Sequence, residues 1–341
     1  MEPSFHLLFS FYFPIATEQP HSSHLISMEN TTEVTEFLLA GLSDDPEVQI
    51  LLCITFSLIY LLPLVGSPGI PELILLDSRL HTPVDFFLSQ LSLVDFGYSS
   101  AVTPQVVAGF LTGDQTISYE ACVAQLFFFV AFITVESFLL AAMAYDRHAA
   151  VCKPLHRAAA TPTKARARLR PGCSLCGFLN AAGRTGNVSR LSFCRSSVVN
   201  RFFCDAPPLL ALSCSDSYVS EMVILFVVGF NDLSSLLVIF ISYLFIFITI
   251  LRTRSSEGRQ KAFSTCASHL TTVSIFYGTG IFMYSQPSSS HSLGTDKVAS
   301  VFYAMVIPML NPLVYSLRNK EVKSAFKTAV GKAKSSIGFI L

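Results

Sequence analysis

Two acidic residues stand inside otherwise apolar stretches, where a carboxylate is costly unless it is paired. Asp95 ends the run Leu-Ser-Leu-Val-Asp, and Glu136 ends the run Thr-Val-Glu. If the two side chains face each other, they could share a proton or hold a cation such as sodium. The alternative is that each acid is hydrogen-bonded separately and has a purely structural role. Asp95 and Glu136 are therefore candidates for an ion site.

Asp146, Arg147 and His148 follow a long apolar stretch directly. From Cys122 to Ala144 the chain is almost uncharged. An ionised pair after such a run marks the point where a helix leaves the hydrocarbon of a membrane for water. The simplest interpretation is a charged flank that ends a membrane helix, and a more specific role needs support from the rest of the chain.

The composition indicates a membrane protein. Of the 341 residues, 51% are hydrophobic and 13% are charged, whereas a soluble domain has about a quarter charged residues. Basic residues fall between apolar blocks rather than on one surface, so nucleic-acid binding has no support. The nine cysteines do not form a Cys-His cluster at zinc spacing, so no metal site of that kind is expected. An enzyme is not expected either, because no nucleophile, base and orienting group can be placed together on the apolar segments.

Six apolar blocks are long enough to cross a membrane as helices. They cover about residues 49–73, 84–109, 122–145, 221–251, 262–284 and 298–317. Between residues 157 and 193 hydropathy predicts no span, because Gly172 to Ala182 is only mildly apolar and arginines flank it on both sides.

The distribution of basic residues nevertheless requires a crossing in this region. Basic residues, histidine included, gather after the blocks that end near residues 73, 145, 251 and 317. The positive-inside rule places all four groups on the cytoplasmic side, which requires one crossing between Arg170 and Glu221. We therefore predict an all-α integral membrane protein, a bundle of seven transmembrane helices with an extracellular amino terminus. Its parts are an extracellular tail (1–48), the membrane domain (49–317, with a weak fourth span at about 170–190) and a cytoplasmic tail (318–341).

The amino-terminal tail holds a candidate modification site. Residues 1–27 differ in character from the rest, and we interpret them as a dispensable extension before Met28. Asn30 opens the sequence Asn-Thr-Thr, an N-glycosylation sequon close to the first apolar block.

Four cysteines would face the extracellular side, where disulfides persist. They are Cys122 at the outer end of the third span and Cys194, Cys204 and Cys214 in the following outer segment. The sequence alone allows three pairings among them.

Three motifs are specific in combination. The first is Met-Ala-Tyr-Asp-Arg-His around Asp146, and the second is Lys-Ala-Phe-Ser-Thr-Cys-Ala-Ser-His-Leu, which runs from Lys261 past His269. The third is Asn-Pro-Leu-Val-Tyr, from Asn311 to Tyr315, preceded by Pro-Met-Leu. Together they resemble the odorant (olfactory) receptor family of the rhodopsin-like G-protein-coupled receptors, over about residues 28–330.

This resemblance implies a function. Such a protein binds small, mostly apolar, volatile odorants within the helix bundle and activates a stimulatory heterotrimeric G protein of the olfactory type, which raises cyclic AMP. It would be a multi-pass protein of the plasma membrane, surrounded by lipid, with no cofactor other than a sodium ion at Asp95 and Glu136. The resemblance also pairs Cys122 with Cys204 and Cys194 with Cys214, and it predicts a short membrane-surface helix in the cytoplasmic tail.

The resemblance assigns two sets of residues. Those expected to act in activation and G-protein coupling are Asp146, Arg147, His148, Tyr243, Lys261, His269, Asn311, Pro312 and Tyr315. Those expected to contact the ligand, between the outer halves of the third, fifth and sixth spans, are Phe129, Val130, Ile133, Thr134, Asn231, Tyr277, Ile281 and Tyr284. Ordinary helix packing is the alternative for each position in the second set.

Some residues depart from the family pattern and keep other interpretations open. Gly-Ser at Ser67 replaces Gly-Asn and removes an amide that would bond towards Asp95, and three prolines disturb the same span. His148 replaces the Tyr of Asp-Arg-Tyr, and the fourth span is rich in Arg and Gly. A receptor-derived chain that inserts poorly or does not signal is therefore an alternative. A transporter or channel is a weaker one, because no internal repeat is found.

Overall fold

The computed structural model describes residues 34–43, 45–76, 83–152, 163–193, 197–214, 218–253, 255–284 and 300–311. Helices make up most of this part of the chain. The long ones are α2 (Pro46–Leu76), α3 (Pro83–Thr112), α4 (Tyr119–Cys152), α6 (Thr163–Val188), α8 (Tyr218–Arg252) and α9 (Ser256–Tyr284). A short helix, α7 (Ala206–Ala211), precedes α8, and the last described segment contains a π-helical turn, η3 (Phe302–Val306).

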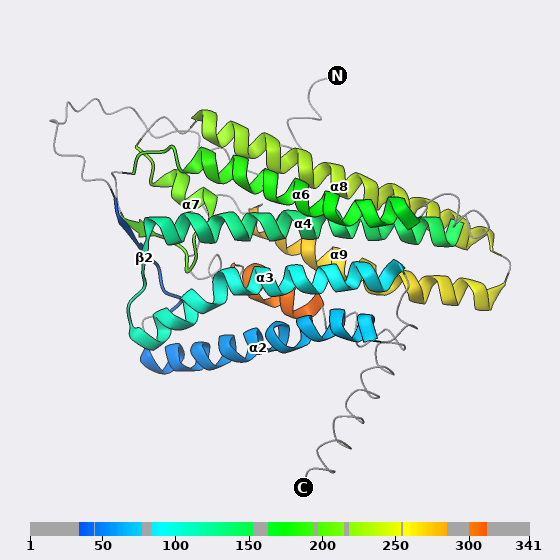
Figure 1. Ribbon diagram of the computed structural model, residues 1–341, viewed down its shortest axis with the longest axis horizontal. Helices are drawn as coiled ribbons and strands as arrows, with labels where there is room; N and C mark the ends of the chain where they lie inside the picture. The colour runs from blue at the N-terminus through cyan, green and yellow to red at the C-terminus, as the bar shows by residue number, and fades with distance from the viewer. Residues whose placement is uncertain are drawn as a thin grey trace, which may run out of the picture.

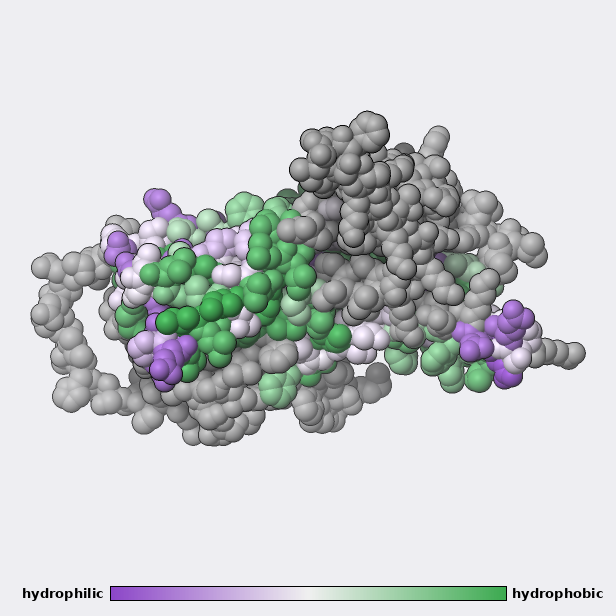
Figure 2. Space-filling view, turned by 90° about the horizontal axis from the view of Figure 1, so that it is seen from below, coloured by the Kyte–Doolittle hydropathy of each residue, from purple (hydrophilic) through white to green (hydrophobic). Residues whose placement is uncertain are grey.

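The six long helices lie side by side along the long axis of the molecule (Figure 1). Helix α4 has a central position and contacts α3, α6, α8 and α9. Large apolar side chains such as Leu51, Phe226 and Phe240 are more than half exposed on the outside of the bundle. Figure 2 shows hydrophobic side chains over the middle of one face and hydrophilic ones towards the two ends. An apolar belt between polar ends is the surface expected of a helix bundle in a bilayer.

Three segments of the described helices are long and apolar enough to cross a membrane by themselves. They are Pro46–Leu64 within α2, Tyr119–Cys152, which is α4, and Met222–Arg252 within α8. Helices α3 and α9 lie where hydropathy predicts further spans. Helix α6 lies where the distribution of basic residues, but not hydropathy, predicts one. The prediction of a mostly helical protein with several apolar helices is therefore confirmed for the described residues.

Local chemistry explains where the helices begin and end. At the start of α2 the Asp45 carboxylate accepts a hydrogen bond from the backbone N–H of Glu47 at 2.9 Å, and Pro46 occupies the first helical position. At the end of α3, Gly113 adopts a φ of 71° and donates its N–H to the carbonyl of Gly109 at 3.0 Å. Glycine is favoured there because other residues resist positive φ.

A small sheet closes one end of the bundle, a feature that the all-α prediction does not include. Its strands are β1 (Glu36–Leu39), β2 (Thr116–Ser118) and β3 (Val198–Val199), in the order β2-β1-β3. β1 pairs antiparallel with β2 and parallel with β3. The amino-terminal tail is therefore held between the turn that precedes α4 and the segment that follows α6.

A disulfide holds the same end of the bundle. Cys122, in the first turn of α4, is bonded to Cys204, which follows β3, and both residues are fully buried. The pairing implied by the resemblance is confirmed for these two residues. Cys214 is also disulfide-bonded, whereas Cys194 lies outside the described residues.

Helix α6 packs closely on α4 through a residue without a side chain. A Cβ added to Gly177 would lie 2.4 Å from Val135 Cγ2 and 3.0 Å from the carbonyl oxygen of Ala131, both on α4. Such distances leave no space for a methyl group. Small residues allow this kind of close approach between membrane helices, where the hydrophobic effect does not drive helices together.

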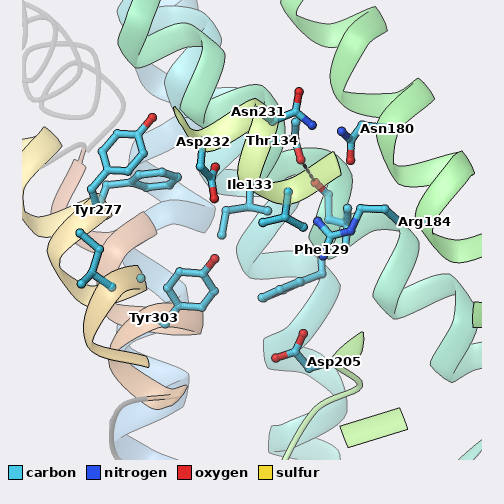
Figure 3. Close-up of a pocket in the computed structure, with 15 residues that line it drawn as sticks. Phe129, Ile133, Thr134, Asn180, Arg184, Asp205, Asn231, Asp232, Tyr277 and Tyr303 are labelled. Atoms are coloured by element: carbon cyan, nitrogen blue, oxygen red, sulfur yellow. Dashed lines mark hydrogen bonds between the residues drawn. The ribbon is translucent and has the colours of Figure 1, made fainter. Parts of the chain in front are cut away.

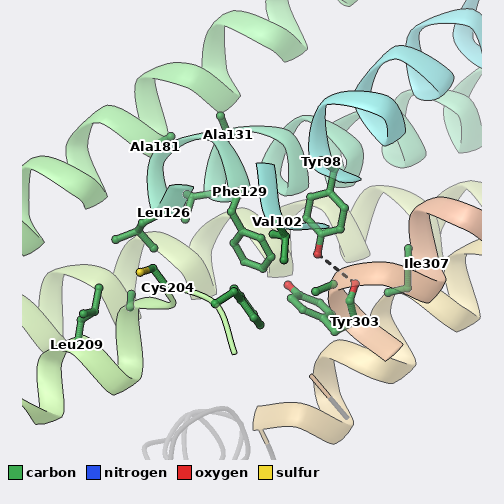
Figure 4. Close-up of a cluster of buried hydrophobic side chains, with 14 of the residues drawn as sticks. Tyr98, Val102, Leu126, Phe129, Ala131, Ala181, Cys204, Leu209, Tyr303 and Ile307 are labelled. Carbon is green, nitrogen blue, oxygen red and sulfur yellow. Dashed lines mark hydrogen bonds between the residues drawn. The ribbon is translucent and has the colours of Figure 1, made fainter. Parts of the chain in front are cut away.

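A buried cluster joins α3, α4 and the last described segment at the middle of the bundle (Figure 4). Phe129 on α4 stacks on Tyr98 of α3, with ring centroids 5.2 Å apart. The Tyr98 hydroxyl donates a hydrogen bond to the Tyr303 carbonyl at 3.1 Å. This carbonyl belongs to the π-helical turn η3, where the backbone departs from the regular helix pattern. Aromatic packing and one polar contact therefore fix η3 against α3 and α4.

Candidate functional site

A cavity lies between α4, α6, α8, α9 and η3 on the sheet side of the bundle. It encloses about 700 Å³ of space between its lining atoms, including its open mouth. Figure 3 shows the side chains around it. The lining residues are Phe129, Val130, Ile133, Thr134, Asn180, Arg184, Asp205, Val228, Asn231, Asp232, Phe276, Tyr277, Gly280, Ile281 and Tyr303. A cavity between helices, lined by apolar and aromatic side chains with a few polar groups, is typical of sites for small organic molecules.

Most of the residues predicted to contact a ligand lie around this one cavity. They are Phe129, Val130, Ile133, Thr134, Asn231, Tyr277 and Ile281. The eighth, Tyr284, is the last residue of α9, and its side chain is outside the described part of the chain. Three helices far apart in sequence therefore bring the predicted set together, and its role in binding stays a prediction.

One side of the cavity is more polar than the sequence prediction of a mostly apolar lining. Asn180 and Arg184 contribute from α6, Asp232 from α8, and Asp205 from the segment before α7. In the sequence, Arg184 is one of the flanking arginines that make hydropathy predict no span here. A signal was nevertheless present, because Gly177, Asn180 and Arg184 recur at three- and four-residue spacing and so share one face of a helix.

Asp205 already has partners. Its Oδ1 accepts the backbone N–H of Ala206 at 2.8 Å and so caps α7, and its Oδ2 lies 3.8 Å from Nη1 of Arg201. Its charge is therefore balanced within the protein.

Tyr277 connects the cavity to Ser137 on α4. Its ring lines the cavity, and its hydroxyl is hydrogen-bonded to the hydroxyl of Ser137 on α4 at 2.9 Å. Both residues are buried. A contact made with Tyr277 inside the cavity can therefore change how α9 sits against α4.

The two acids predicted as an ion site come together in the middle of the bundle. The amide Nδ2 of Asn311 donates to Asp95 Oδ1 at 2.9 Å and to Glu136 Oε1 at 2.6 Å. The remaining oxygens, Asp95 Oδ2 and Glu136 Oε2, are buried without a hydrogen-bond partner among the described residues. Asn311 is predicted from the resemblance to act in activation, and its bridge between the two acids is a finding of the structure.

His269 ties three helices together nearer the other end of the bundle. It is fully buried, its Nε2 lies 3.1 Å from the Leu140 carbonyl on α4, and its Nδ1 lies 2.8 Å from the Tyr243 hydroxyl on α8. Because a carbonyl only accepts, Nε2 carries the hydrogen and Nδ1 accepts from the tyrosine. Both residues were predicted to act in activation, and their direct contact was not foreseen.

The Asp146, Arg147 and His148 segment forms the last turns of α4. Asp146 is buried, and the His148 ring lies 5.6 Å from the ring of Phe245 on α8. Other predicted residues cannot be placed. Asn30, Cys194, Pro312 and Tyr315 lie outside the described residues, and Lys261 is placed in α9 only by its backbone.

Comparison with known proteins identifies a family. A family model described as olfactory receptor matches residues 56–332. Olfactory receptor 5B12 of Homo sapiens is 75% identical over 313 residues, which are 92% of this chain and all of that relative. Olfactory receptor 5B2 of Homo sapiens is 63% identical over 90% of this chain and 99% of its own length. Olfactory receptor 5B21 of Mus musculus is 61% identical over 88% of this chain and 94% of its own length.

Proposed function

The chain belongs to the olfactory receptor family, and from this premise we propose that it binds small odorants in the cavity and activates a stimulatory heterotrimeric G protein. The family consists of membrane receptors rather than enzymes. The observation that carries the proposal is the convergence of seven predicted contact residues from α4, α8 and α9 on one cavity inside the bundle.

The proposed topology has seven membrane helices with the amino terminus outside. The sheet and the Cys122–Cys204 disulfide lie at the extracellular end, since disulfides persist on that side. The turn between α8 and α9 and the end of α4 then lie at the cytoplasmic end, with Arg147 and Lys261 available to a G protein. The basic residues at that end support this orientation.

The proposed signal passes along α9. An odorant that contacts Tyr277 changes its hydrogen bond to Ser137, which holds α9 against α4 at 2.9 Å. Two turns further along α9, His269 holds the same two helices together. Loosening these contacts favours the conformation in which the inner end of α9 moves away from Arg147. The ligand selects this state by binding it more tightly than the resting state.

The acid pair is proposed to hold one positive charge, a sodium ion or a shared proton. The residues present fit such a group, because Asp95 and Glu136 each keep one buried oxygen without a partner among the described residues. A cation there would supply the charge that two adjacent carboxylates lack. Asn311 holds both carboxylates in place by donating to one oxygen of each.

The test combines surface staining with a cyclic AMP assay. An epitope tag placed before Met28 should stain intact cells, and a panel of volatile odorants should then raise cyclic AMP in those cells. Staining only after permeabilisation would favour the poorly inserted chain. Normal surface staining without a response to any odorant would contradict the signalling role.

Two substitutions test the proposed parts separately. Tyr277→Phe removes the hydroxyl that bonds Ser137 and should raise the cyclic AMP level without odorant, while surface staining stays normal. Glu136→Gln should abolish any dependence of the response on sodium, measured by replacing sodium with a large organic cation. A sodium effect that persisted in Glu136→Gln would exclude this pair as its origin.

A further inference from the structure

Arg184 and Asp232 face the cavity from α6 and α8. Arg184 and Asp232 do not form an ion pair with each other. Among the described residues the ion pair is the one between Arg201 and Asp205. No hydrogen bond joins either side chain to another described residue. Both side chains line the cavity, so both are available to a ligand that enters it.

The cavity has both a hydrogen-bond donor and a hydrogen-bond acceptor without a partner among the described residues. Arg184 Nε is a donor, and Asn180 Oδ1 is an acceptor; both are buried and lack a partner among the described residues. Asn180 and Arg184 lie one helical turn apart on α6 and both line the cavity (Figure 3). A molecule bound there has to satisfy a donor and an acceptor from neighbouring turns of α6, because a buried polar group left unpaired is costly.

The charges of the cavity disfavour a charged ligand. Asp205 is balanced by Arg201 at 3.8 Å, so the charges left facing the cavity are one positive, Arg184, and one negative, Asp232. A carboxylate would approach Asp232, and an amine would approach Arg184. An ion would also lose its hydration without a net charge in the cavity to replace it. The ligand is therefore neutral.

We propose that this receptor recognises alcohols, small apolar molecules that carry a hydroxyl group, held between Arg184, Asn180 and Asp232. This inference rests on the proposed odorant binding and specifies its ligand class. A hydroxyl is a small group that both donates and accepts. Its oxygen accepts from the Arg184 guanidinium, and its hydrogen is donated to Asn180 Oδ1 or to the Asp232 carboxylate. An aldehyde, ketone, ester or ether only accepts and leaves these oxygens without a donor.

The hydrocarbon part of the alcohol has apolar partners in the same cavity. Phe129 and Ile133 of α4 and Phe276 and Ile281 of α9 line it. Tyr277 lines it as well, so a molecule bound there can contact the residue proposed to transmit the signal.

The experiment compares matched molecules on cells that express the full chain. The probes are 1-octanol, octyl methyl ether, octanal, octanoic acid and octane, together with the same series built on a cyclic terpene and on a phenylethyl skeleton. Alcohols should raise cyclic AMP at concentrations roughly 10- to 100-fold lower than their methyl ethers, the effect of losing a hydrogen bond to a charged group. Responses led by the acids, the aldehydes, the ethers or the hydrocarbons would overturn the alcohol assignment alone. Silence across the panel, with normal surface staining and a normal forskolin response, would contradict odorant signalling and the inference with it.

Variants of the polar residues test the assignment directly. Arg184→Leu should raise the alcohol concentration needed for half-maximal response at least tenfold, whereas Arg190→Leu, at an exposed arginine just beyond α6, should leave it unchanged. The double variant Arg184→Leu with Asp232→Leu makes this side apolar and should exchange the preference from alcohols to hydrocarbons. Arg184→Leu and Asp232→Leu each remove a charge from a membrane helix, so neither should reduce membrane insertion. An alcohol preference that survived in the double variant would overturn the inference.

Discussion

Helices α4 and α6 pack on each other but differ in almost every sequence property. Helix α4 is apolar along most of its 34 residues and meets the criterion for a membrane span alone. Helix α6 carries arginines, glycines and Pro171 within 26 residues and does not. Apolar content places α4 in a membrane. Helix α6 instead combines exposed leucines such as Leu175 and Leu179, close packing at Gly177 and polar side chains that line the cavity.

The largest expected effect concerns the disulfide bond, which joins α4 to Cys204, whereas the cysteines of α6 are free. Cys122→Ser removes the bond to Cys204 and should reduce stability by about 2–5 kcal/mol, since the open loop regains conformational freedom. We expect most of the protein to be retained inside the cell, measured by surface staining of a tagged receptor. Cys176→Ser, at an exposed free cysteine of α6, is the control and should stain normally.

The next effect compares the lipid faces of the two helices. Leu179 of α6 and Phe128 of α4 are 63% and 44% exposed on the bundle. A lysine in the middle of a membrane helix costs about 2.5–3.5 kcal/mol of insertion free energy. Leu179→Lys should therefore abolish insertion of α6, measured by glycosylation mapping, because the other residues of this helix are not apolar enough to compensate for one lysine.

Phe128→Lys tests the other half of the comparison. The rest of α4 is apolar enough to compensate for one lysine, so insertion should persist. Equal loss of insertion in Leu179→Lys and Phe128→Lys would mean that the two helices do not differ in this respect.

Close packing between the helices should have a somewhat smaller effect. Gly177→Ala places a methyl group 2.4 Å from Val135 Cγ2, so the helices must separate at a cost of about 1–3 kcal/mol. A lower melting temperature of the purified receptor would report this. Gly183→Ala, on the same helix with open space around it, should leave the melting temperature unchanged or raise it slightly. Equal melting temperatures for both variants would argue against tight α4–α6 packing.

The smallest effect extends the comparison to α2, the other helix that departs from the family pattern. Ser67 is fully buried, and its hydroxyl has no hydrogen-bond partner among the described residues. Ser67→Asn restores the amide expected to bond towards Asp95 and should add about 0.5–1.5 kcal/mol of stability. More receptor at the surface would show this gain, whereas Ser57→Asn, half-buried on the same helix, should not produce it.

The sequence predicted the elements that rest on apolar content and charge. The helices around Glu136 and Tyr243 follow from their long uncharged runs, and α6 followed from the positions of basic residues rather than from its own hydropathy. The sheet was not predicted, because strands of two to four residues depend on partners distant in sequence.

The part of the site that was predicted came from helical spacing and from the family resemblance. Phe129 and Ile133 lie one turn apart on α4 and share the cavity, and Tyr277 lines it from α9. Arg184 was missed because its high cost in lipid disappears once it faces a polar cavity. The bridging role of Asn311 was missed as well, since it depends on how three helices meet and not on any local pattern.

The position of β1 within its sheet sets the order in which this protein can be completed during synthesis. β1 lies between β2 and β3, so the strand that leaves the ribosome first gains its second partner only after residue 199 has been made. The helices α2, α3, α4 and α6 are made before that point, and until then the edge of β1 that pairs with β3 has no partner. The end of the bundle that carries the sheet therefore closes late, and a quality-control step that monitors the free tail would also report on whether α6, the least apolar of these helices, has inserted.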